Sequence, residues 1–500
     1  MPARTPPRER TSISPACVPG WARRALLVLT LCVASVATPR SAMAHAHLVR
    51  SAPAAGATLA FQLDRIRLWF SEAVAPVMTR IVVTTPAGAR VSVTSVQVSD
   101  SNPLLAEGTL RSSLGSGHYR VEWSTVAQDD GHPSHGSFEF TVATTASTAG
   151  AATGSLNAVR PVTVKPQDSG ATGDSTREIS VRALDLESPL YIVARTLNFA
   201  ALVTLLGVVS LRLLVIPAVV RGDVSGQSAA FEPVAARAGA RLGLLAGIAS
   251  LLASLGRLRA EFTVVGTEAS VSSLLQTTWG HVWLAQMILS LLACISFALA
   301  ASTDGPLRRT AAWVVASTAV VLMAATPALS GHAVAVQDYK VVSVALDVIH
   351  VLAAGGWLGG LLAIALAGVP AAMFVSSDSG LGGGLPLIAR IVNAFSPTAL
   401  AFATCVMVTG GIAAWLRIGS LSMLLGSAYG EALLIKLAFV AIVLAGGAYN
   451  WLRMRRSLVR YESETAAIIT FRRTAWLELM AGLLVIFATA VLVALSPPMG

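Results

Sequence analysis

The chain has few charged residues for its length. Asp, Glu, Lys and Arg make up 12% of its 500 residues, whereas 54% are hydrophobic. Soluble domains carry about 25% charged residues, so this composition excludes an ordinary soluble protein and predicts several membrane spans. The 36 Lys and Arg outnumber the 26 Asp and Glu, but no basic stripe with interleaved aromatic residues is present. We therefore expect no binding to nucleic acid.

Cysteine is also scarce. The four cysteines lie at positions 17, 32, 294 and 405, and none falls between residues 45 and 142. This spacing excludes a disulfide framework and a cysteine-based metal motif. The sequence also lacks a G-x-x-x-x-G-K-[ST] phosphate loop, so direct coupling to ATP is not expected.

Residues 1–44 have the pattern of a signal peptide. A basic segment precedes an apolar run at 25–38, and Ala42-Met43-Ala44 is typical of a cleavage site. Cleavage there would make His45 the first residue of the mature chain. The alternative is an uncleaved anchor, which would leave the His45 amine in a peptide bond.

Residues 45–142 predict an all-β domain. Segments with alternating or β-branched character occur at 66–70, 81–83, 91–93, 119–123 and 138–142. Turn signals such as Pro86-Ala87-Gly88 separate them. About 100 residues with short strands at this spacing favour an immunoglobulin-like (Greek-key) sandwich or a small Greek-key barrel.

The remainder predicts a linker and a membrane domain. Residues 143–187 are rich in Ala, Thr, Ser and Gly, which is typical of a flexible linker. Residues 188–500 predict an all-α polytopic bundle of about eight helices, with spans near 190–217, 234–256, 280–301, 310–329, 341–367, 396–416, 431–450 and 475–495. Arginines gather in alternate loops, which predicts that those loops are cytoplasmic and that the β domain and the C-terminus lie outside. The glycines at 355, 356, 359 and 360 are expected to permit close helix packing.

Three residues of the β domain predict a metal site. A free N-terminal His45 would bind a metal through its amine and its imidazole together. Asp130 and His132 would add an oxygen and a second imidazole, and a nitrogen and oxygen set without thiolate suits Cu(II) best among first-row metals. The alternative is a polar turn, because Asp-Gly is a common turn dipeptide. His47 and His135 are either additional ligands or solvated side chains.

The membrane segments carry further candidates. Asp347 and His350 are three residues apart and so share a helix face. Ionisable groups inside a span are costly and mark a functional path or an internal contact, so His350 would bind copper, relay protons or fix helix packing. His281 and His332 fall at the predicted outer surface, and in this topology no histidine faces the cytoplasm.

These residues carry a resemblance to two families. The first part resembles the periplasmic copper-binding CopC family, and the matching segments are His45-Ala46-His47-Leu48-Val49, Phe70-Ser71-Glu72, 117–123, Asp130-Gly131-His132-Pro133 and Gly136-Ser137-Phe138. The second part resembles the membrane CopD family, through Ser330-Gly331-His332-Ala333, 347–350, 357–361, Asn450 and Glu478. The resemblance implies a fusion in copper handling, with His45, Asp130 and His132 as Cu(II) ligands. Glu72 would then lie next to the metal site, and we expect one Cu(II) and no Cu(I) there, because Met78 is the only methionine in that domain.

The expected function is copper binding and transport. The β domain would capture Cu(II) outside the cytoplasmic membrane and pass it to or across that membrane, with copper and the lipid bilayer as partners and further copper possible in the bundle. We expect no enzyme activity. One alternative is a copper-dependent redox enzyme with an N-terminal histidine chelate, although Asp130 would fill a position that oxygen needs. Another alternative is a copper chaperone for oxidase assembly, whose protein partner the sequence does not identify.

Overall fold

A computed structural model describes ten segments of the chain. They are residues 46–99, 101–128, 133–143, 189–222, 227–265, 271–330, 340–378, 385–418, 420–457 and 464–495. The predicted leader therefore lies outside the described residues, as does the predicted linker apart from Ala143.

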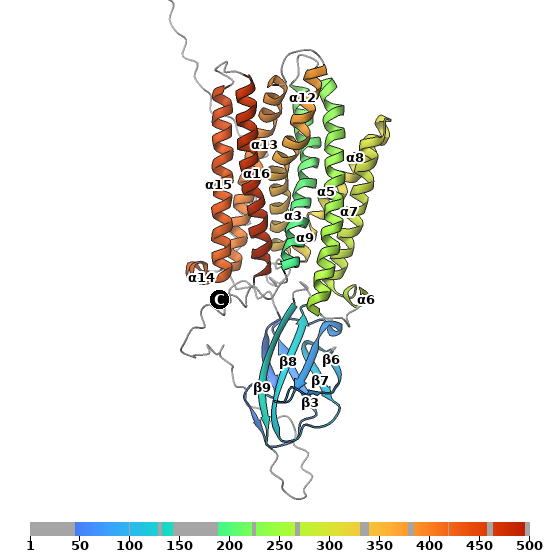
Figure 1. The fold of residues 1–500 in the computed structure, drawn as a ribbon, viewed down its shortest axis with the longest axis vertical. Helices are drawn as coiled ribbons and strands as arrows, with labels where there is room; N and C mark the ends of the chain where they lie inside the picture. Colours follow the sequence, from blue (N-terminus) through green and yellow to red (C-terminus); the bar gives the residue numbers. More distant parts are fainter. Residues whose placement is uncertain are drawn as a thin grey trace, which may run out of the picture. The chain divides into compact units, whose positions relative to one another are not determined.

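The N-terminal part is a β-sandwich of two sheets (Figure 1). One sheet has four strands in the order β1-β3-β7-β6, and the other has five in the order β2-β9-β8-β4-β5. The strands are β1 (Leu48–Ala52), β2 (Thr58–Leu59), β3 (Arg65–Phe70), β4 (Arg80–Thr84), β5 (Arg90–Val91), β6 (Val93–Ser99), β7 (Asn102–Leu110), β8 (Gly117–Val126) and β9 (Pro133–Val142), with a short helix η1 (Pro76–Met78) before β4. The predicted sandwich is confirmed.

Alternating side chains explain this packing. In β3, Ile66, Leu68 and Phe70 are buried, and every second residue of β9 from Phe138 to Val142 is also buried. Strand geometry sends successive side chains to opposite faces, so each sheet presents one apolar face to the other. A Cβ atom at Gly136 would lie 2.7 Å from Cζ2 of Trp123, so the glycine makes room for the indole on the neighbouring strand.

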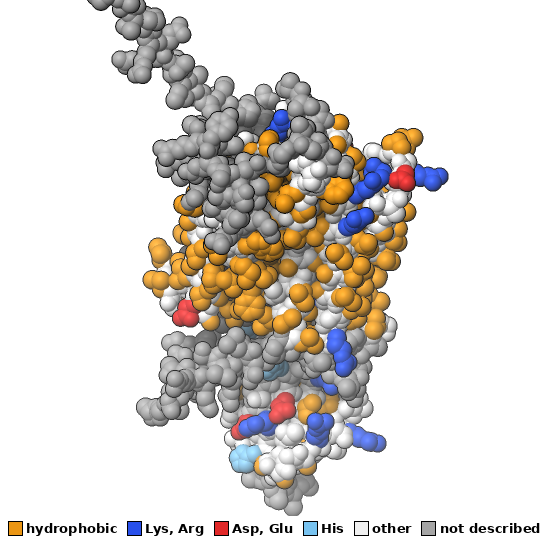
Figure 2. Space-filling model, turned by 45° about the horizontal axis from the view of Figure 1, so that its top comes forward, with side chains coloured by type: hydrophobic (Ala, Val, Ile, Leu, Met, Phe, Trp, Pro, Cys, Tyr) orange, Lys and Arg blue, Asp and Glu red, His pale blue; other side chains and the backbone are white. Residues whose placement is uncertain are grey.

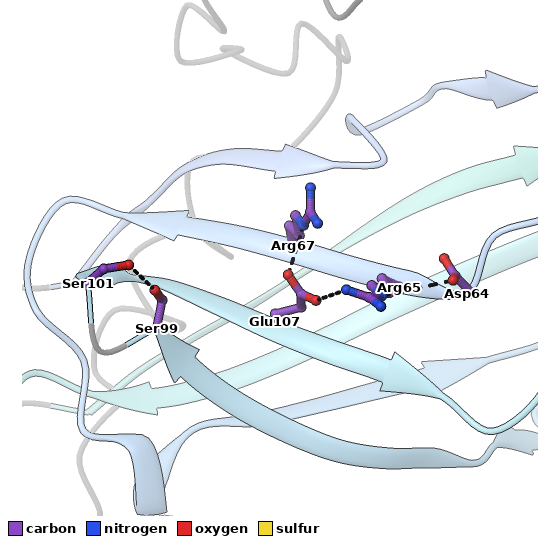
Figure 3. Close-up of polar contacts among 6 residues, drawn as sticks. All are labelled: Asp64, Arg65, Arg67, Ser99, Ser101 and Glu107. Atoms are coloured by element: carbon purple, nitrogen blue, oxygen red, sulfur yellow. Dashed lines mark hydrogen bonds and ion pairs between the residues drawn. The ribbon is translucent and has the colours of Figure 1, made fainter. Parts of the chain in front are cut away.

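Charged side chains of β3 and β7 contact one another on the four-stranded sheet (Figure 3). Glu107 of β7 accepts a hydrogen bond from Arg65 at 3.0 Å and another from Arg67 at 2.8 Å, both on β3. These side chains lie on paired strands, so opposite charges across the ladder stabilise the register. In the turn between β6 and β7, the hydroxyls of Ser99 and Ser101 lie 3.0 Å apart.

The C-terminal part is a helical bundle. Its elements are α3 (Pro189–Ser210), η2 (Leu211–Val215), α4 (Ile216–Arg221), α5 (Gln227–Val265), α6 (Val271–Leu274), α7 (Thr278–Ser302), α8 (Pro306–Met323), α9 (Thr326–Leu329), α10 (Lys340–Ala354), η4 (Gly355–Gly359), α11 (Gly360–Ala363), η5 (Ile364–Gly368), α12 (Val369–Asp378), α13 (Leu385–Ile418), α14 (Leu421–Gly426), α15 (Ala428–Ser457) and α16 (Glu464–Ala494). Among the described residues, eight helices are long and apolar enough to cross a membrane, with mean hydropathy between 1.6 and 2.5. Figure 2 shows hydrophobic side chains over the visible face of these helices. The prediction of about eight spans is confirmed, and the chain is a multi-pass membrane protein.

Glycines bring the first and fifth spans together. A Cβ atom at Gly207 of α3 would overlap the carbonyl group of Gly359 in η4, and one at Gly359 would overlap the carbonyl group of Val203. The π-helical turn η4 places both backbones in direct contact. The predicted packing role of the glycines in this span is confirmed, because any side chain here would separate the helices.

Candidate metal centre

A short segment of the β domain connects both ends of the predicted ligand set. Ser71 pairs with the start of the domain: its N–H donates to the His47 carbonyl at 2.9 Å, and its hydroxyl accepts from the His47 N–H at 2.9 Å. Two residues on, the Ala73 carbonyl accepts from the N–H of Gln128 at 2.8 Å. Val74 forms an isolated bridge with Ala127. Residues 71–74 therefore join the chain just after position 45 to the chain just before position 130.

The three predicted ligands themselves are not described. His45, Asp130 and His132 lie outside the described residues, as does His332 of the membrane part. Across the described ranges, no group of three His, Cys, Asp or Glu side chains is arranged to hold a metal ion. The described part of the predicted site is its support, which consists of β1, residues 71–74 and the facing ends of β8 and β9.

The additional candidates differ in exposure. His47 is half-buried at the entry to β1, and burial lowers the pKa of its imidazole. Glu72 is half-buried in the connecting segment. His135 lies in β9 opposite Ser124 and is exposed, whereas His118 is hydrogen-bonded to the Thr141 hydroxyl at 2.8 Å. His47 and Glu72 thus lie in the support itself, and His135 lies on the solvent face of the adjacent sheet.

The membrane candidates Asp347 and His350 both contact α13. Arg417 donates to an oxygen of Asp347 at 2.7 Å, and Nδ1 of His350 lies 2.9 Å from the hydroxyl of Thr409. The two side chains are three residues apart on α10, so one face of that helix presents both to the same neighbour. The arrangement thus contains one ion pair, and one imidazole that is held at its Nδ1 atom by α13.

The partners of these two residues were not identified from the sequence. Arg417 is mostly buried, and the buried Tyr429 of α15 lies beside it. Lys436 lies about two helix turns after Tyr429 in α15 and acts electrostatically on both Asp347 and His350. One signal was present: Arg417 ends a span on the side predicted to be outside, where the positive-inside rule does not expect arginine.

A second polar group lies between α3, α5 and α7. Asn198 Oδ1 accepts from Gln286 at 2.6 Å and from the Ser250 hydroxyl at 3.3 Å, and Ser250 lies 3.2 Å from Ser290. These four side chains are almost fully buried, and the Ser290 hydroxyl reaches the sulfur of Met323 at 3.9 Å. The group contains no ionisable side chain. It was not predicted, because single Ser, Asn and Gln residues give no periodic signal. His281, by contrast, is exposed in the first turn of α7.

Three family models match successive parts of the chain. The CopC domain matches residues 48–143, the N-terminal domain of copper resistance protein D-like proteins matches 184–339, and copper resistance protein D matches 389–492. The chain is a fusion of the CopC and CopD copper resistance families. In this fusion, Asp347 and His350 of the α10 helix precede the CopD match, whereas Thr409 and Arg417 lie within it.

Two individual proteins and one solved structure are similar to parts or most of this chain. Copper transport protein CutJ of Bacillus subtilis is 25% identical over 471 residues, covering 92% of this chain and 76% of CutJ. Protein YobA of Escherichia coli K12 is 33% identical over 120 residues, which is 24% of this chain and 93% of YobA. The crystal structure of CopC from Methylosinus trichosporium OB3b is similar to 21% of this chain over its own full length, with 25% identity and a TM-score of 0.20. Of these relatives, the copper transport protein matches most of this chain, and the other two match about a fifth to a quarter of it.

Proposed function

We propose that the β domain captures Cu(II) outside the cytoplasmic membrane and passes the copper to or across that membrane through the helical bundle. His45 would bind through its amine and its ring, with Asp130 and His132 completing the site. His281, His332 and His350 would accept the copper in the membrane domain. The protein acts in this proposal as a carrier and not as an enzyme.

The hydrogen bonds of residues 71–74 are the observation that carries this proposal. His47 and Gln128 are both anchored to that segment, and each is two residues from a predicted ligand. Two residues of extended chain span about 7 Å, so His45 and Asp130 are each restricted to a short distance from one shared support. This is the arrangement that a ligand set drawn from both ends of the domain requires.

The chemistry of the three residues favours Cu(II). An amine, two imidazoles and a carboxylate provide nitrogen and oxygen donors, which suit Cu(II) better than Cu(I). A signal peptide cleaved after Ala44 would expose the amine, so export and ligand formation would be one process. The flexible linker would keep the loaded β domain near the bundle and raise its effective concentration there.

Arginine positions support the orientation. Near the span ends expected to lie opposite the exported domain are Arg221, Arg308, Arg309 and Arg390. By the positive-inside rule those span ends would be cytoplasmic, which supports an orientation with the β domain and the C-terminus outside and with His281 and His350 in the outward halves of their helices.

A titration of the β domain with Cu(II) tests the proposal. The described residues of the fragment 45–145 form an apolar core within the sandwich, so this fragment is expected to fold alone. We would compare a version with a free His45 amine with one extended by a single preceding residue, using calorimetry and electron paramagnetic resonance. We expect one-to-one binding by the first and binding weakened by at least about tenfold in the second.

The other results are equally informative. Equal affinity of both versions would show that the His45 amine contributes nothing, and the ligand set would have to move to His47, His132 and His135. Failure of both versions to bind would refute capture by the β domain. Asp130→Asn removes the proposed carboxylate ligand and should weaken Cu(II) binding. The matched control is Asp64→Asn, which changes an exposed carboxylate in the loop before β3 and should leave binding unchanged.

A further inference from the structure

His350 is held by α13 along one edge of its ring. Its Nδ1 lies 2.9 Å from the hydroxyl oxygen of Thr409. A Cβ atom at Gly410 would lie 3.1 Å from Cε1 of the same ring, so the glycine provides the space in which the imidazole sits. Within the described residues, Thr409 is its one side-chain hydrogen-bond partner. The ring is therefore held by the Thr409 hydroxyl at Nδ1 and by a hydrogen bond to the backbone carbonyl of Val406 on the same helix, and no side chain of the described residues is bonded to Nε2.

The direction of this hydrogen bond follows from the hydroxyl group. Thr409 also contacts the carbonyl oxygen of Cys405, one turn back in α13, at 2.7 Å. Two oxygen atoms at that distance require a hydrogen between them, and a hydroxyl has only one hydrogen to donate. Thr409 thus donates to Cys405 and must accept from His350. In the neutral ring, Nδ1 carries the proton and Nε2 carries the lone pair.

We propose that Thr409 is a positioning residue which presents Nε2 of His350 as the copper-binding atom of the membrane domain. Metal-binding histidines generally donate their other ring N–H to a fixed acceptor, which sets the tautomer and the ring orientation. The proposal rests on copper transfer to the bundle as proposed above, and it assigns the coordinating nitrogen within that route. Gly410 has a supporting part, because it allows α13 to approach the ring.

The charged neighbours favour a ligand that binds copper weakly. Asp347, one turn away, is engaged by Arg417, so its carboxylate is committed to an ion pair and is not a free ligand. Lys436 and Arg417 act on the ring with positive charges, and Asp347 partly offsets them with its negative charge; the buried Tyr429 lies beside Arg417. Positive charge opposes any bound cation, and a transit site must release its ion as well as accept it.

Substitutions at Thr409 test this assignment. Thr409→Val keeps the shape of the side chain and removes the acceptor, whereas Thr409→Ser keeps the hydroxyl. Thr404→Val is the matched control: Thr404 bonds to the Leu400 carbonyl at 2.9 Å on the same helix and is exposed. The full-length protein would be labelled with 15N-histidine in lipid nanodiscs, and His350→Gln would identify the His350 signals by difference. Cu(I), supplied already reduced to the purified protein, would be the probe, because Cu(II) is paramagnetic and would broaden the His350 signals; the proposal itself includes no change in the oxidation state of copper.

In the wild type we expect a protonated Nδ1, an unprotonated Nε2 and a Cu(I)-dependent shift of Nε2. Thr409→Ser and Thr404→Val should behave in the same way. Thr409→Val should give a mixture of tautomers and roughly 10- to 100-fold weaker Cu(I) binding, with a matching fall in copper accumulation by cells. A purely structural role for Thr409 would change the protein yield and leave the tautomer unchanged.

A protonated Nε2 in the wild type, or equal behaviour of Thr409→Val and Thr409→Ser, would overturn the inference. Failure of the broader proposal has a different signature. In that case wild-type cells would accumulate no more copper than cells without the protein. The tautomer and the Cu(I) shift of the purified protein would still decide whether Thr409 positions a metal ligand.

Discussion

The bundle contains two polar groups of opposite character. Asn198, Ser250, Gln286 and Ser290 form an uncharged network, almost fully buried, in which each member hydrogen-bonds to another. Asp347 and Arg417 form an ion pair beside His350 and are partly exposed. A satisfied neutral network costs little in an apolar interior and connects helices, whereas ionisable groups inside a span are expensive. From this comparison we expect a structural role for the first group, and copper handling remains our proposal for the second.

Removal of the His350 ring should have the largest effect. His350→Ala is expected to abolish copper-dependent accumulation in cells, because the proposed nitrogen ligand is lost. The Cu(II) affinity of the β domain in the full-length protein should stay unchanged. Copper content by mass spectrometry, normalised to the amount of protein in the membrane, measures the first effect.

The matched control is His118→Ala, which removes an exposed histidine of β8 whose ring bonds to Thr141. It should accumulate copper as the wild type does. Unchanged accumulation by His350→Ala would transfer the role to another group of the bundle and remove the basis of the comparison.

The second-largest effect should be the loss of stability when the ion pair between Asp347 and Arg417 is broken. Asp347→Asn leaves Arg417 without its carboxylate at 2.7 Å. Loss of one member of a fully buried pair costs about 3–5 kcal/mol, and since both side chains retain some exposure we expect about 2–3 kcal/mol here. Unfolding in mixed detergent micelles measures this loss.

The double variant Asp347→Asn with Arg417→Gln provides the test of mechanism. It removes both charges and should recover most of the stability. A double variant that is as unstable as the two single losses added together would show that the two residues do not act as a pair.

Strand prediction worked where large side chains alternate. β3, β8 and β9 carry Leu68, Val121, Phe138 and similar residues inward, and their pattern predicted them. β7 was missed because its inward residues include Ala106 and Gly108, which give little hydrophobic signal. A Cβ at Gly108 would lie 3.1 Å from Cδ1 of Ile81. Gly108 is small because the other sheet packs against it at this point. The sequence pattern of one strand carries no information about such a contact.

The candidate site shows the same limit. Asp347 and His350 could be selected because two ionisable residues three positions apart are conspicuous in an apolar helix. Their partners Arg417 and Thr409 are 70 and 59 residues away, and only the packing of α10 on α13 brings them together. Cleavage before His45 and the ligand role of Asp130 and His132 remain predictions, since those residues lie outside the described part of the chain.

The uncharged network should affect stability alone. Asn198→Ala removes the acceptor shared by Gln286 and Ser250; the Gln286 amide would lose this acceptor, whereas Ser250 would keep its contact with Ser290. Hydrogen bonds between membrane helices contribute about 1 kcal/mol, so a loss of that size is expected in micelle unfolding. Copper accumulation per folded molecule should not change. A selective loss of accumulation would assign this network to the copper path and contradict the division made above.

The smallest effect should come from Lys436. Its positive charge acts on the His350 ring and opposes any cation bound there. Lys436→Gln removes the charge and keeps a polar side chain of similar reach, so Cu(I) binding by the full-length protein should become tighter. Two charges that interact by roughly 1 kcal/mol across a partly apolar region correspond to about a fivefold change in affinity. A competition titration with a Cu(I) chelator measures it, with Lys340→Gln at the exposed start of α10 as the control. Tighter binding combined with slower accumulation would mean that release of copper from His350 limits transport. Weaker binding would contradict this prediction and would show that Lys436 helps to hold the copper.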